Sequence, residues 1–252
     1  MTSDVVARAA EAISRARAIT VLTGAGVSAA SGIPTFRGAG GLWKKVRAET
    51  LASAEAFEND PKLVWEWYDW RRGMIRDAQP NPAHAVLAKW TRDRPGTSVI
   101  TQNVDGLHER AGTDPITRLH GSIWHVRCWT GCAAGREDWR DDTVPLPALP
   151  PRCPHCGGLV RPGVVWFGES LDPAVLQGAT EAAARCNVFL TVGTSAVVYP
   201  AAGLVPHARR AGATVIEINP EATNASGIAD IAIRQPADEA LAEIDTLLVG
   251  RV

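Results

Sequence analysis

Short apolar runs rich in β-branched residues recur along the chain and alternate with segments of helical pattern. Four runs begin apolar and end in small or polar residues: AITVLTGAG (18–26), TSVITQNVD (97–105), NVFLTVGTS (187–195) and TVIEINPE (214–221). The run at 228–233 is a candidate fifth strand, and Ala- and Leu-rich segments between the runs, such as 85–90 and 239–248, predict helices. Buried strands that alternate with helices indicate an α/β fold with a parallel sheet.

The ends of these four strands carry candidate ligand-binding residues. In open parallel sheets, ligands bind beyond the carboxyl ends of the strands. The first strand ends in a glycine-rich turn, and the other three end in Gln102-Asn103-Val104-Asp105, Gly193-Thr194-Ser195 and Asn219-Pro220-Glu221. Because the carboxyl ends of parallel strands meet at one edge, these groups predict a site of dinucleotide size.

The turn after the first strand, GAGVSAASG, fits the pattern G-x-G-x-x-A through Gly24, Gly26 and Ala29. Such a turn lets the backbone approach a pyrophosphate and presents amides at a helix start. A hydride-transfer dehydrogenase would continue with a long helix, whereas here the glycine- and proline-rich segment 31–43 follows. This segment predicts a mobile cover over a cofactor. A disordered linker is the alternative, and it is disfavoured because the segment contains the large side chains of Phe36, Arg37 and Trp43.

Composition narrows the function classes. With 26 basic and 27 acidic residues among 252, no global field favours nucleic acid or an anionic membrane as a partner. No apolar run approaches the roughly 18 residues of a membrane span. The N-terminal segment has the pattern of an amphipathic helix and lacks the apolar stretch of a signal peptide. We therefore expect a soluble, cytoplasmic protein.

Four of the five cysteines form two pairs, CWTGC (Cys128, Cys132) and CPHCGG (Cys153, Cys156). Two such turns can complete a tetrahedral zinc site in a reducing compartment. His125 or His155 in place of one cysteine is an alternative ligand set, and a catalytic zinc is an alternative role, although four thiolates leave no position for water. A nucleic-acid-binding knuckle is disfavoured, because acidic residues at 137, 138, 141 and 142 offset the arginines nearby.

The segment VWEWYDWRRGMI (64–75) has the composition of a buried helix, yet it contains Tyr68 and Arg71. Residues three apart lie on one face of a helix, so the phenol and the guanidinium are predicted to point the same way. Either they form a binding site for an acidic group, or they are structural, with Arg71 stacked on Trp67.

Together these motifs resemble the sirtuin family, the NAD-dependent protein lysine deacylases. The resemblance is carried, in order from residue 24 to 221, by GAGVSAASGIPTFRG, TQNVDGLHERAG, LHGS, the paired cysteines, GVVWFGE, VGTSAVVYPAAG and INPE. It implies a large Rossmann-like domain and a smaller lobe made of a zinc-binding module and a helical module. The implied segments are 1–37, 83–122 and 163–252 for the large domain, 38–82 for the cofactor loop and helical module, and 123–162 for the zinc-binding module. The resemblance also implies that NAD is consumed as a co-substrate and that one zinc ion is structural.

The resemblance assigns roles to the strand-end residues. The pyrophosphate is expected on the turn of Gly24, Ala25, Gly26 and Ala29, under a cover that includes Phe36, Arg37 and Trp43. The nicotinamide and its ribose are expected beside Gln102, Asn103 and Asp105, with Asn103 also counted as catalytic. The remaining phosphate and the adenosine are expected beside Gly193, Thr194, Ser195, Asn219, Glu221 and Ala237.

His120 of LHGS resembles the catalytic histidine of the family. Departure of nicotinamide generates an oxocarbenium-like ribose carbon, and the weakly nucleophilic amide oxygen of acyl-lysine must be held in line with it. A base then activates a ribose hydroxyl, which a histidine can do near neutral pH. The implied products are free lysine, nicotinamide and O-acyl-ADP-ribose. A structural histidine that caps a turn is the alternative for His120.

The implied partners are acyl-lysine proteins or peptides, bound along Val165, Phe167 and Gly168. Tyr68 and Arg71 resemble the marker of the class III branch, which acts on succinyl-, malonyl- and glutaryl-lysine, because an arginine fork and a phenol can together hold a carboxylate. Acetyl-lysine is expected as a further substrate. The alternatives are a deacetylase in which Arg71 is structural, a protein ADP-ribosyltransferase, and an NAD sensor without catalysis.

Overall fold

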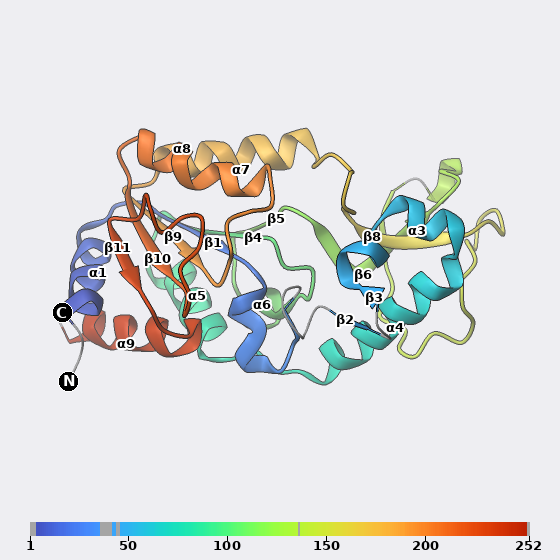
Figure 1. Cartoon of the computed structure of the whole chain (residues 1–252), viewed down its shortest axis with the longest axis horizontal. Helices are drawn as coiled ribbons and strands as arrows, with labels where there is room; N and C mark the ends of the chain where they lie inside the picture. The colour runs from blue at the N-terminus through green and yellow to red at the C-terminus, as the bar shows by residue number, and fades with distance from the viewer. Residues whose placement is uncertain (1–3, 36–41, 44–45, 136, 251–252) are drawn as a thin grey trace.

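The computed structural model describes residues 4–35, 42–43, 46–135 and 137–250, and these form two lobes (Figure 1). The large lobe is built on a parallel six-stranded sheet with the spatial order β5-β4-β1-β9-β10-β11. Its strands are β1 (Ile19–Thr23), β4 (Thr97–Thr101), β5 (Ile116–Arg118), β9 (Val188–Val192), β10 (Thr214–Ile218) and β11 (Ile231–Ile233). Numbered along the chain within this sheet, the order is 3-2-1-4-5-6, the doubly wound Rossmann order, and the predicted α/β class is confirmed.

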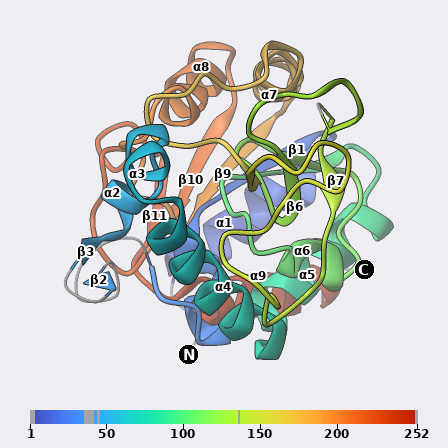
Figure 2. The ribbon, with the colours of Figure 1, turned by 90° about the vertical axis from the view of Figure 1, so that its right-hand side faces the viewer.

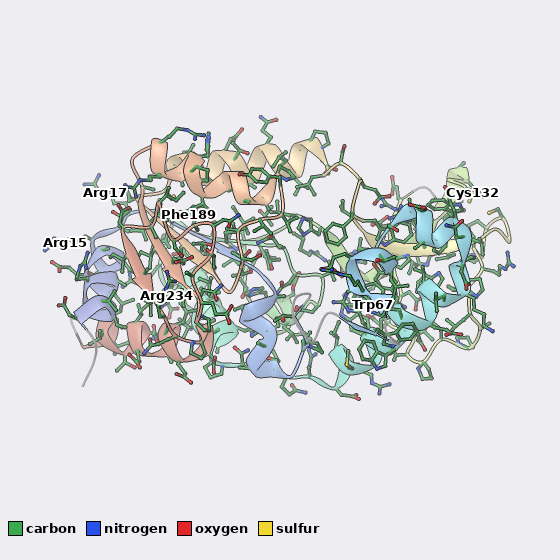
Figure 3. All side chains as sticks on the ribbon, in the orientation of Figure 1. Arg15, Arg17, Trp67, Cys132, Phe189 and Arg234 are labelled. Carbon is green, nitrogen blue, oxygen red and sulfur yellow. The ribbon has the colours of Figure 1, made fainter. Side chains whose placement is uncertain are left out.

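Helices cover both faces of the sheet, as Figure 1 shows with α7 and α8 above it and α1, α5 and α9 below. The lower layer is α1 (Asp4–Arg15), α5 (Pro82–Asp93) and α9 (Ala237–Val249), and the upper layer is α7 (Pro173–Arg185) and α8 (Leu204–Arg210). Successive strand residues enter opposite layers, as a period of two requires. Leu190 packs with the lower helices and Phe189, labelled in Figure 3, with the upper ones. The central strands are therefore apolar on both faces.

The short elements of the large lobe lie at its loops. They are η1 (Ala25–Ser31), which follows β1 and ends at Gly32, α6 (Leu107–Arg110) after β4, and η4 (Ala201–Gly203) before α8. Gly32 has a φ of 81°, in the left-handed region that glycine tolerates. The helix start predicted after the first strand is thus a short 3₁₀ turn.

The small lobe faces the viewer in Figure 2. Its sheet has three antiparallel strands in the order β7-β6-β8, and the pair β2–β3 forms a separate two-stranded hairpin. The elements are β2 (Leu42–Trp43), β3 (Val46–Arg47), α2 (Ala48–Leu51), α3 (Ala54–Asn59), α4 (Pro61–Asp77), β6 (Gly121–Cys128), η3 (Ala133–Gly135), β7 (Trp139–Arg140) and β8 (Val160–Val164). The strand β8 crosses the module boundary expected at 162/163, and the other expected boundaries stay predictions.

The helix predicted over 64–75 is α4. Asp60 caps it by accepting the Leu63 amide at 2.9 Å, and Pro61 occupies its first turn, where no amide hydrogen is needed. Its buried face is tied to the small sheet, because the Trp65 indole donates to the Val160 carbonyl at 2.7 Å and Arg72 Nε donates to the Ile123 carbonyl at 2.9 Å. These bonds satisfy polar atoms that burial would otherwise penalise.

None of the helices in the described part of the chain combines the length and apolar character needed to cross a bilayer.

Candidate active site

A cavity of about 1170 Å³ opens at the carboxyl ends of the large sheet and extends to the small lobe. This volume lies just above the usual range of ligand pockets, roughly 300–1,000 Å³. The predicted strand-end residues in its wall are Gly24, Ala25, Gly26, Ala29, Gln102, Asn103, Gly193, Thr194, Ser195, Asn219, Glu221 and Ala237. The structure therefore brings the ends of β1, β4, β9 and β10 together, as the sequence predicted.

The glycine-rich turn lies at the switch point of the sheet, between β1 and β9. The Gly24 amide donates to the Val192 carbonyl at 3.1 Å, and the Gly26 amide donates to the Gly193 carbonyl at 2.8 Å. A Cβ on Gly26 would lie 2.8 Å from that same carbonyl oxygen, closer than any side chain tolerates. Glycine is thus required here by the contact between two loops, and this contact forms the floor of the cavity.

Amide side chains join the ends of four strands, β1, β4, β9 and β10, across this floor. The Gln102 side-chain amide donates to Thr194 Oγ1 at 3.0 Å and to the Thr23 carbonyl at 3.3 Å. The Asn219 amide donates to the Thr194 carbonyl at 3.2 Å. The polar groups that face the cavity are thus held in fixed positions before any ligand binds, which lowers the cost of ordering them.

Asn103 is oriented by a buried chain of polar groups. Its side-chain amide donates to Ser28 Oγ at 3.1 Å, and Ser28 donates to Asp105 Oδ2 at 2.8 Å. Burial raises the pKa of Asp105, while bonds from the Leu107 amide and from Ser28 act in the opposite direction. Asp105 is not among the residues described as lining the cavity, and its contact with Asn103 runs through Ser28, for which no role is predicted from the sequence.

His120 lies between β5 and β6 and lines the cavity. Its Nδ1 is 3.0 Å from the Gln102 carbonyl oxygen, which can only accept, so Nδ1 carries the hydrogen. In the neutral ring the free lone pair is then on Nε2. Burial lowers the pKa of His120, and the bond to the Gln102 carbonyl partly offsets this. The imidazole ring is therefore neutral near pH 7 and has a fixed orientation.

Two further histidines lie behind Ser28, outside the cavity wall. The Asn81 amide donates to His84 Nδ1 at 3.2 Å, and His108 Nε2 is 3.0 Å from Thr23 Oγ1. The two rings are in contact, with centroids 4.8 Å apart. Burial lowers the pKa of His84 to about 4, and burial together with His84 lowers that of His108 to about 3. Both rings are therefore neutral at pH 7 and pack behind the residues that line the cavity.

Tyr68 and Arg71 line the part of the cavity formed by α4. Both are buried, with relative exposures of 2% and 9%. The Arg71 guanidinium also lies 5.0 Å from the centroid of the Trp67 ring, so the stack expected as the structural alternative exists alongside the position in the cavity wall. Burial raises the pKa of Tyr68 to about 12, although Arg71 and a hydrogen bond from Trp166 lower it. The phenol is therefore protonated at neutral pH.

The remaining predicted residues divide into three groups. Val165, Phe167 and Gly168 line the cavity, and Phe167 is 45% exposed. Trp43 is not among the residues described as lining it, and its ring lies 6.1 Å from that of Trp70. Phe36 and Arg37 lie outside the described residues, as does the rest of the loop 36–41.

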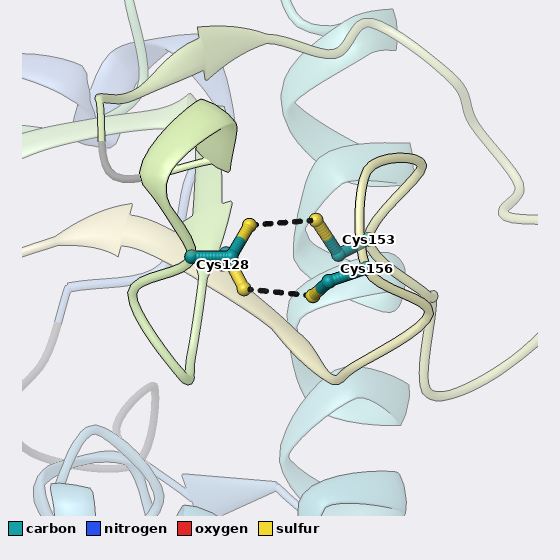
Figure 4. A group of neighbouring side chains, drawn as sticks. Cys128, Cys153 and Cys156 are labelled. Carbon is teal, nitrogen blue, oxygen red and sulfur yellow. Dashed lines mark hydrogen bonds between the residues drawn. The ribbon is translucent and has the colours of Figure 1, made fainter.

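The four paired cysteines meet at the far end of the small lobe, where Figure 3 labels Cys132 (Figures 3 and 4). Sγ of Cys128 is 3.6 Å from that of Cys156, Sγ of Cys132 is 3.8 Å from that of Cys153, and all four lie within 4.8 Å of one another. Tetrahedral zinc with Zn–S bonds of about 2.3 Å needs sulfur separations of about 3.8 Å. The four cysteines are positioned to bind one structural zinc, and no histidine belongs to this group within the described residues.

Comparisons with known proteins cover most of the chain. The model of the Sir2 family matches residues 24–200. An NAD-dependent protein deacylase of Aquifex aeolicus (strain VF5) is 54% identical over 226 residues, which cover 90% of this chain and 93% of that protein. A crystal structure of a Sir2 homolog–NAD complex is 44% identical with a TM-score of 0.91, covering 97% of this chain and 94% of the other. A structure of Sir2 with the inhibitor EX-527, 2′-O-acetyl-ADP-ribose and a deacetylated p53 peptide is 29% identical with a TM-score of 0.83, covering 95% and 97%.

Proposed function

The chain belongs to the Sir2 family of NAD-dependent protein deacylases, and from this premise we propose that it removes acidic acyl groups from lysine. Succinyl and malonyl are the foremost substrates in this proposal, with glutaryl and acetyl as further ones. The enzyme uses NAD as a co-substrate, and lysine deacylation yields nicotinamide and O-acyl-ADP-ribose. The substrates are acyl-lysine side chains of proteins or peptides.

In this proposal, NAD occupies the cavity at the switch point. The turn at Gly24–Ala29 holds the pyrophosphate, and Thr194, Ser195, Asn219, Glu221 and Ala237 serve the phosphate and adenosine side. Gln102 and Asn103 serve the nicotinamide ribose, with Asp105 acting through Ser28. The support is that these groups line one cavity whose volume suits a dinucleotide together with a second substrate. Phe36 and Arg37 are assigned to the cover by the family resemblance alone.

His120 is the proposed general base. Its Nδ1 hydrogen is held by the Gln102 carbonyl, and this fixes Nε2 as the atom that accepts a proton. A base must be deprotonated to act, and burial favours the neutral form of this ring. Nε2 would remove the proton from a ribose hydroxyl as that oxygen attacks the acyl carbon.

The preference for acidic acyl groups rests on one observation, the position of a buried arginine and a buried tyrosine in the wall of the same cavity as His120. An acyl-lysine whose amide lies near His120 and whose chain points toward α4 would bring its terminus to Arg71 and Tyr68. A terminal carboxylate can accept two bonds from the guanidinium and one from the phenol. A terminal methyl group can accept none.

An acyl panel tests the proposal. The purified protein is incubated with NAD and one peptide sequence carrying succinyl-, malonyl-, glutaryl- or acetyl-lysine, and O-acyl-ADP-ribose and free peptide are quantified by mass spectrometry. We expect succinyl and malonyl to give the highest kcat/KM, and His120→Ala to abolish product formation while NAD still binds. An acetyl preference would refute the acidic specificity, and labelled ADP-ribose attached to protein would indicate ADP-ribosyl transfer instead.

We also propose that the protein works in a reducing compartment such as the cytoplasm. All five cysteines are free thiols in the structure, and a four-thiolate zinc site requires them to stay reduced.

A further inference from the structure

A buried hydrogen bond joins two walls of the part of the cavity that Tyr68 and Arg71 line, which is called the acyl end below because the proposed acyl group would lie there. The Trp166 indole donates from Nε1 to Tyr68 Oη at 2.9 Å, from the segment after β8 to the middle of α4. Both residues are only 2% exposed, and both line the cavity. Trp166 belongs to the GVVWFGE motif, and the motif by itself indicates no role for this residue.

This bond decides which way the phenol can donate. A phenolic oxygen carries one hydrogen to donate and can also accept a hydrogen bond. Because the indole N–H is only a donor, Oη accepts on the side of Trp166 and cannot donate in that direction. Arg71, the charged neighbour on the same helix face, also offers only donors. We infer that Trp166 is a specificity-determining positioning residue: its indole N–H turns the phenolic hydrogen of Tyr68 toward the cavity, where it selects acyl groups that end in a hydrogen-bond acceptor.

The protonation state of the phenol agrees with this role. Burial raises the pKa of Tyr68 to about 12 despite the opposing influence of Arg71 and Trp166, so the hydroxyl retains its hydrogen at working pH. A donor that cannot ionise distinguishes a carboxylate from a methyl group in the way a positive charge does, but it also imposes a direction.

Trp166 is itself held rigidly. The Arg161 guanidinium stacks 3.6 Å from the centroid of its ring, and Arg161 forms a two-pronged ion pair with Glu169, whose Oε2 accepts from Arg161 Nη2 at 2.9 Å. Glu169 Oε2 also accepts the main-chain amide of Trp166 at 2.8 Å. On the other side, the Phe57 ring lies 5.3 Å from the indole. An aromatic side chain fixed at both its ring and its backbone cannot rotate away from Tyr68 without breaking this set of contacts.

The inference rests on the proposed acidic-acyl function and assigns part of its specificity to a residue that need not touch the acyl group. Trp166→Phe keeps an aromatic ring in the cluster and removes the N–H donor together with the five-membered ring of the indole, a loss of volume that the control variant below matches. With the phenol free to rotate, we expect the ratio of kcat/KM for succinyl-lysine to that for acetyl-lysine to fall about threefold to tenfold, the loss of one hydrogen bond. The change should appear in KM for succinyl-lysine, because the acyl terminus is remote from the reacting carbonyl.

Trp65→Phe is the matched control. Trp65 is also a buried indole in contact with Tyr68, with ring centroids 6.3 Å apart, but its N–H donates to the Val160 carbonyl and it does not line the cavity. This variant should lose stability and leave the succinyl/acetyl ratio unchanged. Because both substrates are measured on one preparation, the ratio does not depend on the fraction of folded enzyme.

A double-mutant cycle gives the sharpest test. In a Tyr68→Phe background there is no phenolic hydrogen to direct, so adding Trp166→Phe should change the ratio less than twofold. If Trp166→Phe lowers the ratio equally with and without the hydroxyl, or not at all in the wild type, the inference is overturned. Should Trp166→Phe not fold, Arg161→Lys tests the same support, because it keeps the charge and loses the flat stack. An unchanged ratio in that variant would likewise overturn the inference.

Failure of the inference and failure of the proposed function give different results. A wild-type enzyme that favours succinyl-lysine and loses this preference in Tyr68→Phe, but not in Trp166→Phe, retains the function and overturns the role of Trp166. A wild-type enzyme that favours acetyl-lysine, with the same preference in Tyr68→Phe, overturns both.

Discussion

Replacing Arg71 with methionine is the perturbation that tests the acidic-acyl function most directly. Methionine keeps much of the length and apolar bulk of the side chain and removes the guanidinium fork. Arg71 is 9% exposed, lines the cavity and lies 5.0 Å from the centroid of the Trp67 ring. Burial lowers its pKa, with Tyr68 and Asp105 opposing the shift, but an arginine stays charged at any working pH. The substitution therefore removes one fixed positive charge from the cavity wall.

The size of the effect follows from the kind of bond that is lost. A hydrogen bond to a charged group contributes about 1.5–3 kcal/mol, which corresponds to roughly 10- to 150-fold in kcat/KM. The low exposure of Arg71 places the pair away from bulk water, where screening is weak. We therefore expect kcat/KM for succinyl-lysine to fall by at least tenfold. Acetyl-lysine has no carboxylate, so its kcat/KM should change much less.

The assay compares succinyl- and acetyl-lysine in one peptide sequence on one enzyme preparation. Arg72→Met is the matched control, because Arg72 is the next residue of α4 and is fully buried but does not line the cavity. Its Nε donates to the Ile123 carbonyl, and its guanidinium lies between Trp65 and Trp124, so its loss should reduce stability and lower both activities together. If Arg71→Met behaves in the same way, with both activities reduced by one factor, Arg71 supports the fold through Trp67 and the acidic-acyl reasoning is refuted.

Three other predictions concern protonation and metal binding. Because burial lowers the pKa of His120, the acid limb of kcat/KM should have its midpoint below pH 6.5; a midpoint above that value would contradict its role as a buried base. Cys153→Ser should lower the zinc content below one ion per chain and reduce the apparent Tm, where a loss of about 2 kcal/mol corresponds to roughly 4–8 °C in a protein of this size; an active, stable and zinc-free variant would contradict the structural site. His84 and His108 have folded-state pKa values of about 4 and about 3, below the ordinary 6.5, so the unfolded state binds more protons below pH 6.5 and stability falls as pH falls. Denaturant unfolding should show a loss of roughly 3–4 kcal/mol between pH 7 and pH 5 from these two groups, and replacing both with glutamine should flatten that dependence.

Much of the large lobe could be predicted from the sequence because its strands are buried on both faces. Continuous apolar runs such as VFLTV give a clear strand signal, and each run ends where the chain meets the cavity. The strand β5 was not predicted, since Ile116–Arg118 is only three residues long, lies at the sheet edge and is half-buried throughout. A run that short carries no measurable periodicity.

The zinc group could also be predicted, because the spacing within each cysteine pair forces the two thiols of one loop close together. The helix α4 was evident from its composition and has clear start signals in Asp60 and Pro61. Its two functional candidates could be placed on one face from helical geometry alone.

Partners that meet only after folding could not be predicted. Ser28 lies 77 positions from Asp105, and Trp166 lies 98 positions from Tyr68, so no local pattern links either pair. Trp43 is expected in the cofactor cover, and its ring lies 6.1 Å from that of Trp70, a contact that no sequence pattern indicates; its role at the cofactor stays a prediction. Sequence order places a residue near its neighbours along the chain, whereas cavity walls are made by segments that are distant in sequence.

In the small lobe, one buried cluster connects the four cysteines to the acyl end of the cavity. Trp129 lies between the first two cysteines, and its ring is 5.1 Å from Phe57, which is in turn 5.3 Å from Trp166. Trp166 then donates to Tyr68 in the cavity wall. The same buried cluster contains the ligand candidates Cys128 and Cys153. A close-packed core transmits displacement, so a metal that fixes the loop at Trp129 also stabilises the position of the indole that orients Tyr68. The motifs appear in the sequence as separate modules, but the packing connects the zinc site to the surface that we propose binds the acyl group.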